Sequence, residues 1–195
     1  PPRDAHSLAD AIERLARDAG LRARLGAAAR ELATREYAEE IVVTQTLDLY
    51  QAQGIRHIIA LRGDLPSGAA RAGELRYANE LVEFIRARTG DWFSLEVACY
   101  PEFHPQARSA GDDLRNFKRK IDAGANGAIT QYFYNADAYF RFVDECEALG
   151  VAVPIVPGIM PIANFSQLAR FSDACGAEIP RWIRLKLQSF GDDAA

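Results

Sequence analysis

The chain has few cysteines, no long apolar run and no large excess of charge of one sign. Its three cysteines, Cys99, Cys146 and Cys175, form no C-x-x-C pair and have no histidine at ligand spacing. This argues against a disulfide framework and a metal site, and predicts buried, neutral thiols in a reducing cytoplasm. No apolar run approaches about 18 residues, so we expect no membrane partner. A net charge of −4 gives no electrostatic reason to expect a nucleic-acid partner.

Several catalytic and nucleotide-binding motifs are also missing. No G-x-G-x-x-G follows an apolar run and no G-x-x-x-x-G-K-[ST] is present, so neither a Rossmann dinucleotide site nor a P-loop is indicated. No G-x-S-x-G or Cys–His pair supports nucleophilic catalysis. The chain opens Pro1-Pro2-Arg3-Asp4 with neither Met nor an apolar leader, from which we expect that it begins inside a longer reading frame.

The pattern of the chain changes near residue 53, and we predict two domains, residues 1–53 and 54–195. The first carries only helix signals, with Ser7 as the expected N-cap, Gly20 as the expected end of the first helix and His6 in solvent. The second alternates short apolar runs with helical patterns, which is typical of βα units on a parallel sheet. Strands are predicted at 55–61, 93–99, 127–133 and 151–156, and helices at 75–88, 112–123, 136–149, 164–175 and 180–190.

Polar residues stand at the carboxyl ends of three of the predicted strands. Arg62 and Asp64 follow the first, Glu102 and His104 follow the second, and Gln131 lies near the end of the third. Each residue also has an ordinary structural explanation. Asp64 could cap a turn, His104 could form hydrogen bonds within its own loop, and Gln131 could form a hydrogen bond to a strand edge. Ligands bind at the carboxyl ends of strands in parallel α/β folds. These residues should meet at that edge of the sheet, here called the rim, which favours a ligand-binding site.

The helix predicted at 112–123 adds a polar face. Asp113, Asn116 and Lys120 lie at i, i+3 and i+7, and Arg119 stands beside Lys120. An ordinary solvated face is the alternative interpretation. Next to the rim, however, one amide and two cations could bind phosphate, and Asp113 could accept a hydrogen bond from a ribose hydroxyl.

Strings containing these residues resemble the methylenetetrahydrofolate reductase family. The strings are GIRHIIALRGDLP at 54–66, YPEFHP at 100–105, KRKIDAGAN at 118–126, ITQYF at 129–133 and PGIMP at 157–161. They occur in the family's order, and the resemblance covers residues 54–193. It implies an α/β fold that is part of a TIM (βα)8 barrel, with about four consecutive βα units and parallel strands, preceded by the all-α segment.

The resemblance also implies a flavoprotein oxidoreductase of one-carbon metabolism and methionine biosynthesis. The family passes a hydride from NAD(P)H to FAD and then to 5,10-methylenetetrahydrofolate, forming 5-methyltetrahydrofolate. Position by position, Asp64 and Gln131 are the catalytic candidates, and Gln131 and Phe171 match folate and nicotinamide contacts. The positions that match flavin contacts are Arg62, Gly63, Asp64, Tyr77, Ala78, Tyr100, His104, Asp113, Asn116, Arg119 and Lys120.

The chain also departs from the family. The family's first three strands, including the Glu that acts as general acid, have no counterpart before Gly54, and no eighth strand follows. Residues 1–50 instead resemble the carboxyl-terminal helical tail of a GT-B family 4 glycosyltransferase, in the strings PPRDA, LRARLG and TLDLY. The chain therefore looks like a hybrid joined at 51–54, which is a natural fusion, an engineered chimera or an artefact of sequence assembly.

Three interpretations of function stay open. The chain is a weak or inactive FAD-dependent reductase, a non-catalytic half-barrel that binds flavin or folate, or a fold without a ligand. In each case the strands at 55–61 and 151–156 would lose a neighbour that a closed barrel supplies. The exposed apolar surface predicts a homo-oligomer.

Overall fold

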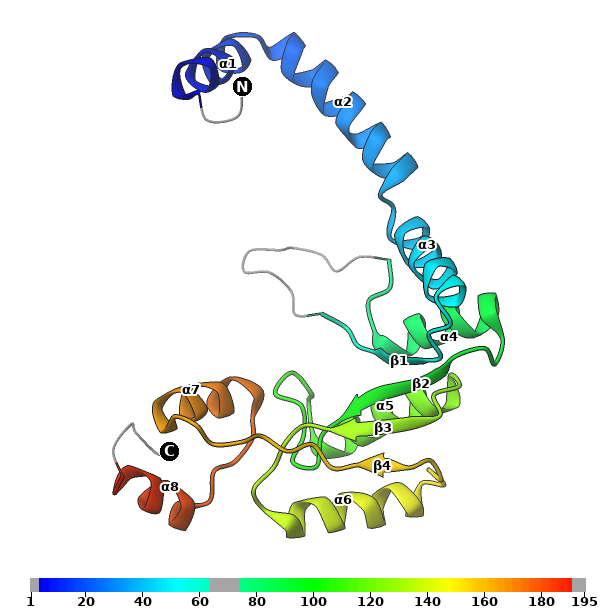
Figure 1. Ribbon diagram of the computed structural model, residues 1–195, viewed down its shortest axis with the longest axis vertical. Coiled ribbons are helices and arrows are strands. Elements are labelled where there is room, and N and C mark those ends of the chain that lie inside the picture. The colour runs from blue at the N-terminus through cyan, green and yellow to red at the C-terminus, as the bar shows by residue number, and fades with distance from the viewer. Residues whose placement is uncertain (1–3, 64–73, 191–195) are drawn as a thin grey trace. The chain divides into compact units, whose positions relative to one another are not determined.

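The computed structural model describes residues 4–63 and 74–190 of the chain (Figure 1). The chain forms two compact units, Pro1–Tyr50 and Gln51–Ala195. The first unit is helical, with α1 at Ala5–Arg17, α2 at Ala19–Glu36 and α3 beginning at Glu39 and ending at Ala52, just inside the second unit. No helix in the described ranges is both long and apolar enough to cross a membrane.

The first helix begins and ends at aspartates rather than at the predicted residues. The Asp4 carboxylate accepts from the backbone N–H groups of His6 at 3.0 Å and Ser7 at 3.3 Å, so the prediction of Ser7 as the N-cap is wrong. The helix ends at Arg17 with Asp18 as its C-cap, and not at Gly20, because the Asp18 carboxylate accepts from a backbone N–H of the next helix and thereby caps α2. His6 is exposed, as predicted.

The second unit contains a four-stranded parallel sheet with the strand order β1-β2-β3-β4. The strands are β1 His57–Ala60, β2 Ser94–Cys99, β3 Gly127–Thr130 and β4 Ile155–Val156. The helices that alternate with them or follow them are α4 Ala78–Thr89, α5 Ala110–Asp122, α6 Ala136–Ala148, α7 Phe165–Cys175 and α8 Arg181–Gln188. The predicted sequence of βα units and the parallel sheet are confirmed.

β4 is much shorter than the predicted strand at 151–156. The Pro154 carbonyl accepts from the Ala128 N–H at 2.9 Å, but proline has no N–H to donate in return. The pairing with β3 therefore includes only Ile155 and Val156 as strand residues.

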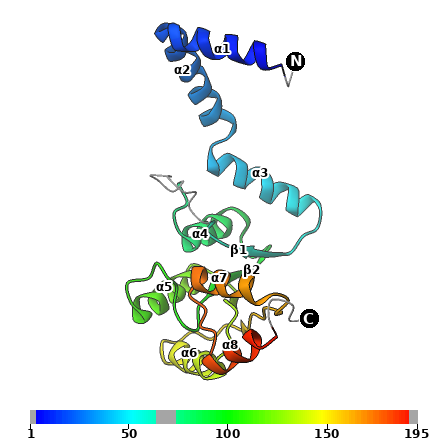
Figure 2. The ribbon, with the colours of Figure 1, turned by 90° about the vertical axis from the view of Figure 1, so that its left-hand side faces the viewer.

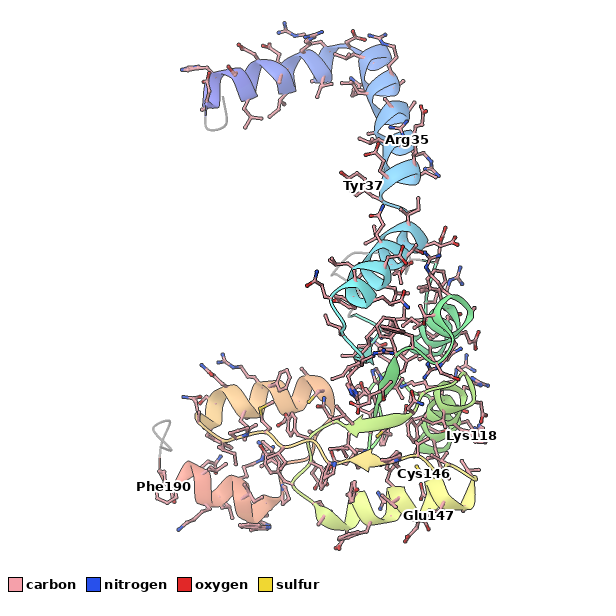
Figure 3. The ribbon with its side chains drawn as sticks, turned by 45° about the vertical axis from the view of Figure 1, so that its right-hand side comes forward. Arg35, Tyr37, Lys118, Cys146, Glu147 and Phe190 are labelled. Carbon is pink, nitrogen blue, oxygen red and sulfur yellow. The ribbon has the colours of Figure 1, made fainter. Side chains whose placement is uncertain are left out.

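The main core lies on one face of the sheet. Leu95, Val97 and Cys99 alternate along β2 and are all buried. Helices α4, α5 and α6 supply the other side of this core through buried side chains such as Val82, Ile85, Phe117, Phe142 and Cys146. Figure 3 shows Cys146 on the side of α6 turned toward the sheet and Glu147 on the opposite side.

The cysteines behave as the sequence predicts. Cys99 and Cys146 are buried, Cys175 is half-buried, and all three are free thiols. Burial raises the pKa of Cys146 to about 12 and raises the pKa of Cys99 above its ordinary range as well. Both buried thiols are therefore neutral at physiological pH.

The opposite face of the sheet is largely uncovered by the described residues. The side chains of Ile59 on β1 and Val156 on β4 are 51% and 49% exposed, and Leu61 just after β1 is 54% exposed. Within the described residues the sheet is open at β1 and at β4.

Helices α7 and α8 form a second, smaller core with the segment that follows β3 (Figure 2). Tyr132, Leu168, Ala177 and Ile179 are buried in it. This cluster places α7 and the connection between α7 and α8 close to the carboxyl end of the sheet.

Candidate functional site

The segments that follow β1 and β2 are joined by a side-chain hydrogen bond. Arg62 lies two residues after β1, and its Nη2 donates to Oε1 of Gln106 in the loop after β2 at 2.7 Å. Gly63 is exposed, with no atom within 4 Å of the position that a Cβ would take. Asp64, the other residue predicted here, lies outside the described residues.

The loop after β2 is ordered by its own side chains. The rings of Tyr100 and His104 meet edge to face at 4.7 Å. His104 Nδ1 accepts from the Gln106 N–H at 3.0 Å, so a neutral His104 ring carries its proton on Nε2. The backbone N–H of His104 donates to Oδ2 of Asp113 at 2.9 Å, which joins the loop to α5. Tyr100, His104 and Asp113 are thus brought together.

The polar face predicted for α5 divides into an inner and an outer part. Lys120 is half-buried and donates from Nζ to the Ala98 carbonyl at 2.8 Å, so the alternative of an ordinary solvated face is wrong for this residue. Asn116 and Arg119 are exposed, and Arg119 Nη1 donates to Asn116 Oδ1 at 2.8 Å. The helix therefore presents one cation to the sheet and one to solvent.

Electrostatics connect the inner cation to the rest of the rim. Burial lowers the pKa of Lys120, the Asp113 carboxylate opposes this, and the nearby Arg62 guanidinium lowers the pKa further. Two cations of the rim thus repel each other. An anionic group bound beside them would relieve this repulsion, so the donor chemistry fits a phosphate-bearing ligand.

Gln131 and Phe171 lie on the side of the rim nearer α7. The Gln131 N–H donates to the Cys99 carbonyl at 2.8 Å, and its side-chain Oε1 accepts from the Tyr132 N–H at 3.2 Å. Phe171 on α7 stacks on Tyr132 with ring centroids 5.9 Å apart, and the Tyr132 hydroxyl bonds Ser172 Oγ at 2.8 Å. Both predicted residues therefore meet at Tyr132.

Tyr77 and Ala78 form the beginning of α4. Glu80 accepts from the backbone N–H groups of Arg76 at 2.5 Å and Tyr77 at 3.0 Å, which fixes the first turn. Ala78 is buried, whereas Tyr77 is exposed. Within residues 74–190 no recorded hydrogen bond or ring contact joins Tyr77 or Ala78 to His104 or Lys120, so the two residues lie at the margin of the site.

Two side-chain contacts in this region have no local signal in the sequence. Oε1 of Gln106 accepts a hydrogen bond from the Arg62 guanidinium, and Oε2 of Glu102 accepts one from the Glu178 N–H at 2.8 Å. The second pair is separated by 76 positions, so only the fold brings it together. No group of three or more metal-ligating side chains occurs in ranges 4–63 and 74–190.

Comparison with known proteins places the chain among reductases of one family. The family model for methylenetetrahydrofolate reductase matches residues 9–195. The 5,10-methylenetetrahydrofolate reductase of Escherichia coli (strain K12) is 48% identical over 145 residues, covering 74% of this chain and 48% of the relative. The enzyme of the same name from Pectobacterium carotovorum is 45% identical over 161 residues, covering 83% and 51%. This chain thus spans about half the length of these curated relatives.

A solved structure with a weaker likeness is an uncharacterized protein from Clostridium thermocellum that binds two copies of 5-methyl-5,6,7,8-tetrahydrofolic acid. It is 22% identical, has a TM-score of 0.48, and covers 70% of this chain and 44% of its own. The resemblance of residues 1–50 to a glycosyltransferase tail is not addressed by these matches and stays a prediction. Since the family model matches almost all of the sequence, the chain belongs to the methylenetetrahydrofolate reductase family.

Proposed function

We propose that this chain supplies a flavin-binding part of an FAD-dependent methylenetetrahydrofolate reductase. The observation that carries the proposal is the meeting of Arg62, Lys120 and Asp113 at the carboxyl ends of β1 and β2. The family match supports the reaction class, in which NAD(P)H is the reductant and a folate is the substrate. When bound, FAD would accept a hydride from NAD(P)H and pass it to 5,10-methylenetetrahydrofolate.

The residues of this chain have separate roles in the proposal. Lys120 is the proposed phosphate donor on the side of α5 that faces the sheet, and Arg119 is the proposed donor on its solvent-exposed side. Asp113 accepts from a ribose hydroxyl while its other oxygen holds the His104 N–H. Gln131 contacts the folate, and Phe171 offers an exposed ring for stacking against nicotinamide or folate.

A flavin-binding experiment tests the proposal directly. The chain reconstituted with FAD and freed of excess cofactor should show a flavin absorbance spectrum. Arg119→Ala should weaken FAD binding about tenfold or more, because a hydrogen bond to a charged group contributes about 1.5–3 kcal/mol. Lys118→Ala is the matched control, since Lys118 lies on the same helix and is paired with Asp122 at 2.7 Å (Figure 3). Equal flavin affinity in the parent and Arg119→Ala would remove the phosphate assignment.

A second candidate is binding of flavin or folate without turnover. The exposure of Ile59 and Val156 favours it, because the sheet face that would enclose reactants is open to water in the described residues. NADH oxidation with menadione as electron acceptor separates the two candidates. Turnover supports the reductase, whereas a flavin spectrum without turnover supports the binding role.

A further inference from the structure

The loop after β2 contains one residue with a strained backbone. Phe103 has φ of 152°, the only positive value at a non-glycine residue in the described ranges. Such a conformation costs about 1–3 kcal/mol and persists only where the surrounding contacts enforce it. The residues on either side of Phe103 are both tethered, since the His104 N–H donates to Asp113 and the Glu102 carboxylate accepts from the Glu178 N–H.

The Glu102 tether joins two parts of the candidate site. Glu102 lies in the loop that carries His104, whereas Glu178 lies in the connection between α7 and α8. The same two segments also touch at Gly176, where an added Cβ would lie 3.0 Å from Cγ of Pro105. The connection follows directly from α7, the helix on which Phe171 stacks against Tyr132. The tether therefore spans from the flavin side to the folate side of the proposed site.

The second carboxylate oxygen of Glu102 is buried without compensation. Its Oε1 has no hydrogen-bond partner among the residues that the structure describes. Glu102, Gln131 and Cys175 line one small pocket between the loop after β2 and the end of α7. A buried polar atom without a hydrogen-bond partner lowers the stability of the fold, and such atoms are rare in native structures.

We propose that Glu102 is a positioning residue that clamps the α7–α8 connection to the His104 loop and thereby holds the folate side of the site against the flavin side. This role rests on the proposed function, but the clamp itself is defined by contacts within the chain. Glu102 acts through the Glu178 amide and through the strained Phe103, and it touches neither reactant in this account.

The clamp should respond to pH in a definite direction. Burial raises the pKa of Glu102 above its ordinary value of 4.5; the bond from the Glu178 N–H and the charge of Arg141 oppose this, and the Glu178 carboxylate adds to it. The closed clamp therefore binds a proton more tightly than an open clamp would, so acidification favours the closed state and rising pH weakens it. The other titratable groups that line the same pocket are Tyr100, Tyr132 and Cys175.

Amide hydrogen exchange at Glu178, measured by NMR on the full chain without any ligand, tests the clamp. In Glu102→Ala the Glu178 amide should exchange about tenfold faster than in the parent, because its acceptor is gone. Glu102→Gln keeps a side-chain acceptor and should restore most of the protection. It should also remove the pH dependence, since an amide does not titrate. Unchanged Glu178 exchange in Glu102→Ala would overturn the proposal.

Glu178→Gln is the matched control, because it removes the facing carboxylate and leaves the backbone donor in place. It should shift the midpoint of the pH dependence of the Glu178 amide to lower pH without loss of protection. A parent whose Glu178 protection, corrected for intrinsic exchange, does not fall between pH 4 and neutrality would also contradict the clamp. Failure of the chain to bind FAD would refute the proposed function alone, since the exchange measurement needs no flavin.

Discussion

Replacing Arg86 should destabilise the second unit more than replacing an ordinary surface cation. The Arg86 guanidinium, on α4, donates from Nε to the Gly124 carbonyl at 2.9 Å and from Nη1 to the carbonyls of Phe93 at 2.8 Å and Gly90 at 3.0 Å. Its Nη2 donates to Asn126 Oδ1 at 2.5 Å. One side chain thus joins the end of α4, the start of β2 and the turn between α5 and β3.

The expected loss of unfolding free energy depends on which of these acceptors are shielded from water. The bonds to Gly124 and Phe93 are partly buried, and the Arg86 side chain is only 15% exposed. A hydrogen bond from a charged donor contributes about 1.5–3 kcal/mol, and the two exposed acceptors can turn to water instead. Arg86→Ala should therefore cost about 3–6 kcal/mol for the two partly buried bonds, a large part of the total stability of about 5–15 kcal/mol for a domain.

Urea unfolding followed by circular dichroism measures this loss. Arg86→Lys should recover little of it, because one ammonium cannot reach acceptors that lie on three sides of a planar guanidinium. Arg115→Ala is the control, since the Arg115 side chain is 61% exposed and its ion pair with Asp112 lies at the surface, where such pairs add little to stability. If Arg86→Ala and Arg115→Ala unfold at the same urea concentration with the same slope, the reasoning about buried acceptors is refuted.

Two further predictions concern packing. Gly158→Ala should cost about 1–3 kcal/mol or more, because the new Cβ would collide with the Thr130 carbonyl oxygen while the Gly158 N–H is held by Thr130 Oγ1 at 2.9 Å. Gly26→Ala, with nothing within 4 Å of the position of the new Cβ, should instead be neutral or stabilising; thermal unfolding followed by circular dichroism measures both variants. The exposed Ile59 and Val156 predict self-association, visible by light scattering at micromolar concentration and reduced in Ile59→Glu; a monomer that binds no hydrophobic dye would contradict this.

The order of strands and helices was predictable because hydrophobic periodicity is a local property of the chain. The ends of the elements were not, since they depend on partners elsewhere. The third strand was expected to run to residue 133, but β3 ends at Thr130. Phe133 stacks on Tyr139 of α6 with ring centroids 5.2 Å apart instead of continuing the strand. Likewise, Asp4 and Ser7 are both good capping residues, and only the folded backbone shows that Asp4 accepts the bonds.

The candidate site was predictable as a set of positions but not as a set of contacts. The spacing of Asp113, Asn116 and Lys120 places them on one helix face whatever the fold. That Lys120 turns inward to the Ala98 carbonyl while Arg119 stays in solvent depends on how α5 packs against β2. The sequence therefore placed Arg119 and Lys120 together, although one cation lies in solvent and the other lies against the sheet.

The loop after β2 is the element on which the parts of the site converge. Three hydrogen bonds join this loop to three other parts of the chain. Gln106 accepts from Arg62 in the segment after β1, the His104 N–H donates to Asp113 on α5, and Glu102 accepts from the Glu178 N–H in the α7–α8 connection. A change on the α5 face, such as Arg119→Ala, removes one proposed phosphate contact and leaves these three bonds in place. A change at Glu102 releases a segment that carries part of the proposed folate side. Arg119→Ala should therefore lower flavin affinity without moving the proposed folate side. A substitution of Glu102 should instead change the position of the folate side relative to the flavin side, because the hydrogen bonds that leave the loop are independent of one another.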